Sequence, residues 1–174
     1  MQIKRYNAIV IADLLYGVWD CIGVAVLSRT LINEKAPASF KKSFTDLFNR
    51  TQDLLRSVCP QGWMSLPVPY SDNASFIACG IPAVAITMLP ADEASLYARE
   101  LSVNHDLENA VLNRESSKKE RMESHVPEYA YKERIPLTWR LFHTQKDNAA
   151  SLTRDSFGVM SAILAGLAAL KVPV

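Results

Sequence analysis

Apolar residues along this chain occur in short continuous runs that alternate with longer stretches of helical spacing. Residues 6–15 are apolar at nearly every position, which is typical of a strand covered on both faces in a parallel or mixed sheet. Residues 22–28 and 81–89 predict two further strands. Residues 63–68 predict a short strand, which Pro67 confines to a sheet edge or a loop. A sheet is therefore the expected centre of the fold.

Between these runs, the spacing of apolar residues predicts amphipathic helices. The longest is introduced by residues 37–39 and carries one apolar stripe, made of Phe40, Phe44, Leu47, Phe48, Leu55 and Val58. Residues 71–72 predict the N-terminal cap of a short helix over residues 73–79, which Gly80 ends. Asp92 predicts the cap of another helix before the chain turns polar.

The last part of the chain returns from polar to apolar segments. Residues 104–134 are polar and predict a solvated helical insertion rather than a separate domain. Residues 137–142 are apolar again and predict a strand that ends at His143. Ser151 or Thr153 predicts the cap of a final helix, with its inward residues at Phe157, Met160, Ile163, Leu164 and Leu167.

The alternation of strands and helices predicts an α/β sandwich, a class in which sites collect at the carboxyl ends of strands. Asp13 and His143 both lie at such predicted ends, although singly an aspartate there is more often a turn cap and one histidine a structural residue. The 174 residues suit one domain, and the 49% apolar residues can form its core. A net charge of +1 gives no general attraction to nucleic acid or to anionic lipid.

Cysteines and terminal segments define the expected compartment. Cys21, Cys59 and Cys79 show no CxxC spacing, so they predict buried thiols rather than a disulfide framework or a structural zinc site. The N-terminal residues lack the apolar region and cleavage site of a signal peptide. Residues 157–170, about fourteen in number, fall short of the ~20 that a membrane span needs. The default expectation is a cytoplasmic chain.

Three segments carry motifs in a fixed order. The first is residues 8–13, AIVIAD, with Gly17 and Asp20 after it; the second is residues 71–83, SDNASFIACGIPA; the third is residues 143–147, HTQKD. Together they resemble the co-catalytic zinc aminopeptidase family, whose relatives include glutamate carboxypeptidase and glutaminyl cyclase. The resemblance covers nearly the whole chain except residues 104–134, but only the downstream half of the family's catalytic domain.

The resemblance implies a three-layer αβα sandwich with a mixed, mostly parallel sheet, of which residues 1–174 form a single partial domain lacking its N-terminal side. It also implies a two-zinc hydrolase, in which a metal-activated water attacks a peptide bond and Asp13 and His143 bind different zinc ions. The family's general base and its other ligands lie upstream, so the catalytic residues have no counterpart in this chain. One ligand per ion cannot hold zinc tightly, so the isolated chain is expected to be inactive.

Other residues take lesser roles by the same resemblance. Ser71 and Asp72 are similar to the pair that opens the family's helix, and Asn73 stands where relatives often carry histidine. Tyr70 and Val68 both precede this cap, where family members place an oxyanion-stabilising tyrosine, and only Tyr70 has a hydroxyl.

Two functions from different classes therefore compete. The first is the C-terminal portion of a zinc hydrolase that acts on peptides after joining its upstream half, another protein chain or, through uncovered strands, a second copy. The second is a non-catalytic module of the same fold that binds a peptide or a protein. Asp147 has two alternative roles. It either caps the final helix, which is the role we favour, or orients the loop that contains His143.

Overall fold

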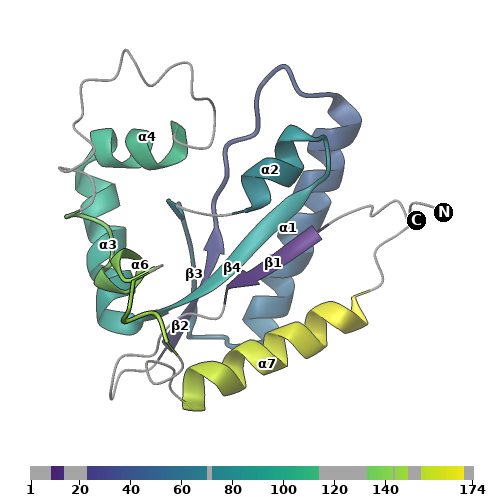
Figure 1. Cartoon of the computed structure of the whole chain (residues 1–174). Coiled ribbons are helices and arrows are strands. Elements are labelled where there is room, and N and C mark those ends of the chain that lie inside the picture. The colour runs from purple at the N-terminus through teal and green to yellow at the C-terminus, as the bar shows by residue number, and fades with distance from the viewer. Residues whose placement is uncertain are drawn as a thin grey trace.

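The computed structural model describes residues 23–69, 72–113, 133–142, 144–148 and 154–170, together with the backbone of residues 9–13. Within these residues the strands are β1 (Ile9–Asp13), β2 (Gly23–Ser28), β3 (Trp63–Leu66) and β4 (Ala83–Pro90). The helices are α1 (Ala38–Val58), α2 (Asn73–Ala78), α3 (Ala91–Val103), α4 (His105–Asn113), α6 (Leu137–Arg140) and α7 (Arg154–Ala169) (Figure 1).

The strands form one mixed sheet in the order β1-β4-β2-β3. β1 runs parallel to β4, with Asp13 opposite Thr87, and β2 runs parallel to β3. The central pair, β2 and β4, is antiparallel, with Leu27 opposite Ile86. The predicted α/β class and the mixed sheet are therefore confirmed, and β3 is an edge strand within the described sheet, as Pro67 indicated.

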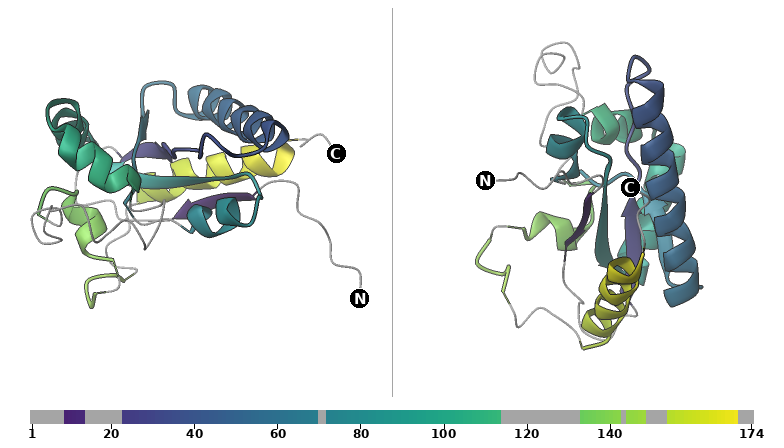
Figure 2. Two further views of the ribbon diagram at one scale, coloured as in Figure 1. Left: turned by 90° about the horizontal axis from the view of Figure 1, so that it is seen from above. Right: turned by 90° about the vertical axis from the view of Figure 1, so that its right-hand side faces the viewer.

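Side chains of β2 alternate between two hydrophobic clusters. Val24 and Val26 pack with buried residues of α3, α4 and α6, whereas Ala25 and Leu27 pack with buried residues of α1 and α7. Because successive strand residues point to opposite faces, the two clusters lie on the two faces of the sheet. Figure 2 shows α1 and α7 next to each other and α6 away from them, across the sheet.

Two of the predicted helix ends are confirmed and one is wrong. α1 follows Pro37, whose fixed φ suits a helix start, and Gly80 after α2 has φ of 74°, a conformation that favours glycine. Asp92 does not cap α3, because Pro90 occupies the N-cap position and Asp92 lies in the first turn. A carboxylate there still interacts favourably with the helix dipole.

The predicted polar helical insertion over residues 104–134 is helical in its first part, but that part is not fully solvated. Residues 105–113 form α4, in which Leu107 and Val111 are buried in the cluster on the α3 side of the sheet. The sequence looked solvated because charged residues such as Asp106 alternate with these apolar positions. Residues 114–132 lie outside the described residues.

The predicted strand over residues 137–142 is also wrong. The chain forms the single helical turn α6, in which Thr138 and Trp139 are buried and Leu137 is exposed. Pro136 precedes this turn and fixes a φ that suits a helix start. His143, which follows, lies outside the described residues and does not follow a strand.

α7 confirms the predicted final helix but not its whole inward face. Met160 and Ile163 are buried, whereas Phe157 and Leu164 are exposed. The proposed caps Ser151 and Thr153 lie outside the described residues. None of the helices in the described parts of the chain is both long and apolar enough to cross a membrane.

Candidate functional site

Asp13 is the last residue of β1. Because β1 and β4 are parallel, their carboxyl ends lie at the same end of the sheet, where β4 reaches Pro90. We call this the Asp13 end of the sheet. It is where α/β folds place their active sites, as the sequence predicted for Asp13.

α6 leads the chain to position 143, and it is fixed at this same end. The backbone N–H of Thr138 donates to Glu93 Oε2 at 3.0 Å, and the Trp139 ring lies edge-on to Tyr97 with their centroids 5.3 Å apart. Glu93 and Tyr97 belong to α3, which begins directly after Pro90, the last residue of β4. Figure 1 shows α6 beside α3 at this end.

Glu93 is a residue whose role the sequence did not indicate. Its carboxylate satisfies one of the backbone N–H groups that a helix N-terminus leaves without an intrahelical acceptor. It therefore positions the turn that precedes His143. The only signal in the sequence was that Pro136 precedes Leu137. A proline at the N-cap position has no side chain that can accept a hydrogen bond, so the cap of this helical turn had to come from elsewhere in the chain.

Beyond position 143 the chain makes a compact turn. Thr144 Oγ1 donates to the Leu141 carbonyl at 2.7 Å, and the backbone N–H of Asp147 donates to the Thr144 carbonyl at 3.0 Å. Asp147 is exposed and precedes the described part of α7. Residues 149–153 lie outside the described residues, so its role as a cap stays a prediction.

The second motif lies at the other end of the sheet. Asp72 occupies the N-cap position of α2 without a side-chain cap bond, and Asn73 is fully buried, with its Nδ2 donating to Thr30 Oγ1 at 3.1 Å. Thr30 follows β2, which is antiparallel to β4, so this contact lies toward the start of β4. The structure therefore does not bring Asp72 to Asp13. Tyr70 and Ser71 lie outside the described residues.

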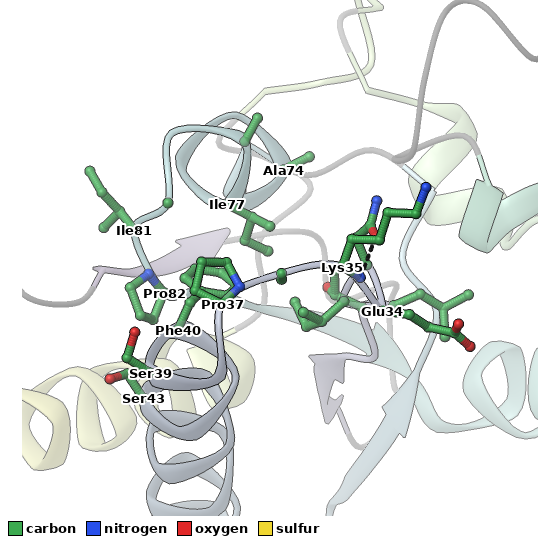
Figure 3. A pocket seen from close by; sticks show the side chains of 17 residues that line it. Glu34, Lys35, Pro37, Ser39, Phe40, Ser43, Ala74, Ile77, Ile81 and Pro82 are labelled. Carbon is green, nitrogen blue, oxygen red and sulfur yellow. Dashed lines mark hydrogen bonds between the residues drawn. The ribbon is translucent and has the colours of Figure 1, made fainter.

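A cavity of about 1080 Å³ occupies this opposite end, which we call the cavity end. Its walls are the loop 30–37, the start of α1 and the segment from α2 to β4. Figure 3 draws Pro37, Phe40 and Pro82 on one side of this lining, and Lys35 and Glu34 on the other. Sequence reasoning missed this cavity because three separate segments form its walls.

The remaining reactive side chains are the potential metal donors and the cysteine thiols. Among the residues that the structure describes, no three His, Cys, Asp or Glu side chains are grouped so as to hold a metal ion. Burial raises the pKa of the half-buried Cys59 thiol, and Cys79 is exposed, so the prediction that all thiols are buried is wrong for Cys79. Cys21 lies outside the described residues.

Comparison of the chain with models of known protein families, with curated proteins and with solved structures finds no match.

Proposed function

We propose that this chain is the C-terminal portion of a zinc-dependent, aminopeptidase-like metallohydrolase. Its mixed sheet, with helices packed on both faces, would form the downstream part of a three-layer αβα sandwich. Zinc, when bound, would activate the water that hydrolyses a peptide bond. The substrate class is therefore a peptide rather than nucleic acid or membrane lipid.

The arrangement at the Asp13 end carries this proposal. Asp13 ends β1, and α6, which leads to His143, is fixed to α3 at the end of the neighbouring strand β4. Two segments far apart in the sequence thus approach the same end of the sheet. A carboxylate and an imidazole are both zinc donors, so the donor chemistry of Asp13 and His143 fits the metal.

Within this site each residue would have a limited role. Asp13 and His143 would each bind one of two zinc ions, and Asp147 would help to fix the turn after the histidine. By the family resemblance alone, Tyr70 is the candidate for stabilising an oxyanion, while Ser71 and Asp72 would have a structural role at the start of α2, toward the other end of the sheet. The general base and the remaining ligands must come from the upstream half or from another chain, so the isolated chain is inactive.

Zinc content tests this proposal. In a complex of this chain with its upstream half, Asp13→Ala or His143→Ala should lower the bound zinc by one ion, as measured by native mass spectrometry. Asp46→Ala and His105→Ala are matched controls, because both side chains are exposed and remote in sequence from the motifs. Unchanged zinc in either test variant would sink the assignment.

A second candidate is a non-catalytic module of the same fold that binds a peptide. The cavity favours it, because its volume of about 1080 Å³ lies just above the ~300–1,000 Å³ of typical ligand sites and apolar side chains such as Phe40 and Ile77 line it. Native mass spectra of the complex separate the zinc hydrolase from the peptide-binding module. A complex that binds peptide at the cavity end and no zinc supports the second.

A further inference from the structure

The two walls of the cavity differ in their chemistry. We call the segment from α2 to β4 the α2 wall, and the loop 30–37 with the start of α1 the loop wall. Within the described lining, the α2 wall has no polar side chain and consists of Ala74, Ile77, Ala78, Gly80, Ile81 and Pro82. Every polar side chain of this lining belongs to the loop wall, which also contributes Phe40. A ligand that fits both walls therefore has an apolar body with its polar group at one end.

The charges of the loop wall favour an anion. Lys35 takes part in none of the ion pairs found among the described residues. Glu34 is the one acidic side chain of the described lining, but Figure 3 shows the Lys35 and Glu34 side chains ending in different directions. The Lys41 ammonium group donates a hydrogen bond to the Glu34 backbone carbonyl, which brings a second positive charge to this loop. Because α1 has no acidic residue in its first turn, nothing there offsets the partial positive charge of its N-terminus either.

Hydrogen bonds within the chain hold the loop wall in place. The backbone N–H of Lys35 donates to Asn33 Oδ1 at 2.8 Å, and the N–H of Ala36 donates to the Asn33 carbonyl at 2.9 Å. At the start of the loop, the fully buried Asn73 donates from Nδ2 to Thr30 Oγ1 at 3.1 Å. Because the Thr30 oxygen accepts this bond, its hydroxyl hydrogen can donate to a ligand. The loop wall thus presents a fixed hydroxyl and an ammonium group, and a carboxylate accepts hydrogen bonds from both.

We propose that the cavity binds an aliphatic carboxylate of the fatty-acid type. Its hydrocarbon chain packs on Phe40 and Ile77, and its carboxylate faces Lys35. The volume of about 1080 Å³ has room for such a chain. The cavity suits this ligand better than an extended peptide, which has polar groups along its whole length that no side chain of the α2 wall could pair. This ligand goes beyond both functions proposed above, and its binding requires no metal.

The test compares decanoate, decanol and decylammonium, which share one hydrocarbon chain and differ only in the head group. Each is titrated into the full chain below its micelle concentration, and the backbone amide shifts in NMR spectra give both the affinity and the place of binding. Decanoate should bind at least about tenfold more tightly than decylammonium, because the second places a like charge beside Lys35. The shifts should concentrate at residues that line the cavity, such as Phe40 and Ile77.

Two variants test the two walls separately. Ala78→Trp fills the cavity from the α2 wall and should abolish binding of all three probes, whereas Ser75→Trp, on the same helix but outside the lining, should not. Lys35→Gln should weaken decanoate several-fold and leave decanol unchanged, because it removes only the charge. Lys42→Gln is its matched control, since Lys42 is exposed near the start of α1 and outside the lining. Circular dichroism checks that each variant is folded, and the Lys35 pair decides the matter if Ala78→Trp is not.

Four results would overturn the proposal. They are no binding of decanoate, equal affinity for decanoate and decylammonium, an undiminished affinity for decanoate in Lys35→Gln, and amide shifts at exposed apolar residues such as Phe157 in place of the cavity. A blocked peptide amide of alanines and leucine is the competing probe. If it binds in the cavity more tightly than decanoate, the cavity is a peptide site and the proposal is wrong. Zinc content does not enter this test, so the hydrolase function and this ligand stand or fall separately.

Discussion

The two ends of the sheet are constructed in different ways. At the Asp13 end, Trp139 is almost fully buried against Tyr97, and Glu93 caps the turn of α6. At the cavity end, the loop 30–37 and the segment after α2 leave an open volume of about 1080 Å³. One end is packed and hydrogen-bonded, and the other leaves room for a ligand.

This difference separates the two candidate functions by what each requires. Metal ligands must be held within a few tenths of an ångström, which needs neighbours that are themselves fixed by packing and hydrogen bonds. The contacts of α6 with α3 provide such support next to position 143. A peptide site instead needs an accessible apolar volume, which the cavity end provides. Variants that loosen one end should therefore leave the other unaffected.

The largest expected effect comes from Trp139→Ala. It removes a side chain that is 1% exposed and should lower the free energy of unfolding by about 3–5 kcal/mol, through lost apolar contacts and a new cavity. Phe40→Ala at the cavity end should cost only about 1–2 kcal/mol, because Phe40 is half-buried. Urea denaturation measures both values.

Trp139→Phe serves as the matched control. Its ring still packs on Tyr97, and the indole Nε1 that it removes is buried without an acceptor among the described residues. The loss should stay below about 1.5 kcal/mol, as for other large apolar replacements that largely keep the volume. A Phe40→Ala variant that is less stable than Trp139→Ala would contradict the assignment of the Asp13 end as the more tightly packed one.

A smaller effect is expected from Glu93→Ala. This change removes the acceptor of the Thr138 N–H and should lower the free energy of unfolding by about 1 kcal/mol, as for other lost helix caps. Hydrogen exchange at the Thr138 amide should accelerate at the same time. Glu100→Ala on the exposed side of α3 should cost less than about 0.5 kcal/mol. Equal exchange rates in the two variants would refute the capping role of Glu93.

The same contact shows which parts of the fold the sequence could predict. α1 was predictable because Phe44, Leu47 and Leu55 form one buried stripe whose spacing is local. The helical turn before His143 was not, because its acceptor Glu93 lies 45 residues upstream of Thr138. An apolar run too short for a helical period was therefore assigned as a strand.

For the candidate site, too, local patterns could be predicted and contacts between distant segments could not. Asp13 at the end of β1 follows from the local apolar run and is confirmed as a strand end. The cavity depends on three segments whose approach is set by the antiparallel pairing of β2 with β4, which no local pattern encodes. The exposed side chains of Phe157 and Leu164 were assigned to the core because apolar spacing alone does not distinguish buried apolar positions from exposed ones.

The smallest expected effect is a difference in thiol reactivity that leaves stability unchanged. Cys59 precedes β3 at the Asp13 end, and Cys79 follows α2 at the cavity end. Burial raises the pKa of Cys59 above its ordinary 9.0, so less of it is thiolate at neutral pH. In a Cys21→Ser background at pH 7, a thiol reagent should label the exposed Cys79 several-fold faster than Cys59, as followed by mass spectrometry.

Raising the pH tests the cause of this difference. Labelling of Cys59 should continue to accelerate above pH 9.0, because its thiolate forms only as the pH approaches its raised pKa. In urea the burial is lost, so the two thiols should react at similar rates. If Cys59 reacts as fast as Cys79 in the folded chain at pH 7, the Asp13 end opens more readily than its packing indicates. The proposed zinc site at the Asp13 end would then become ordered only after the chain that supplies its other ligands had bound.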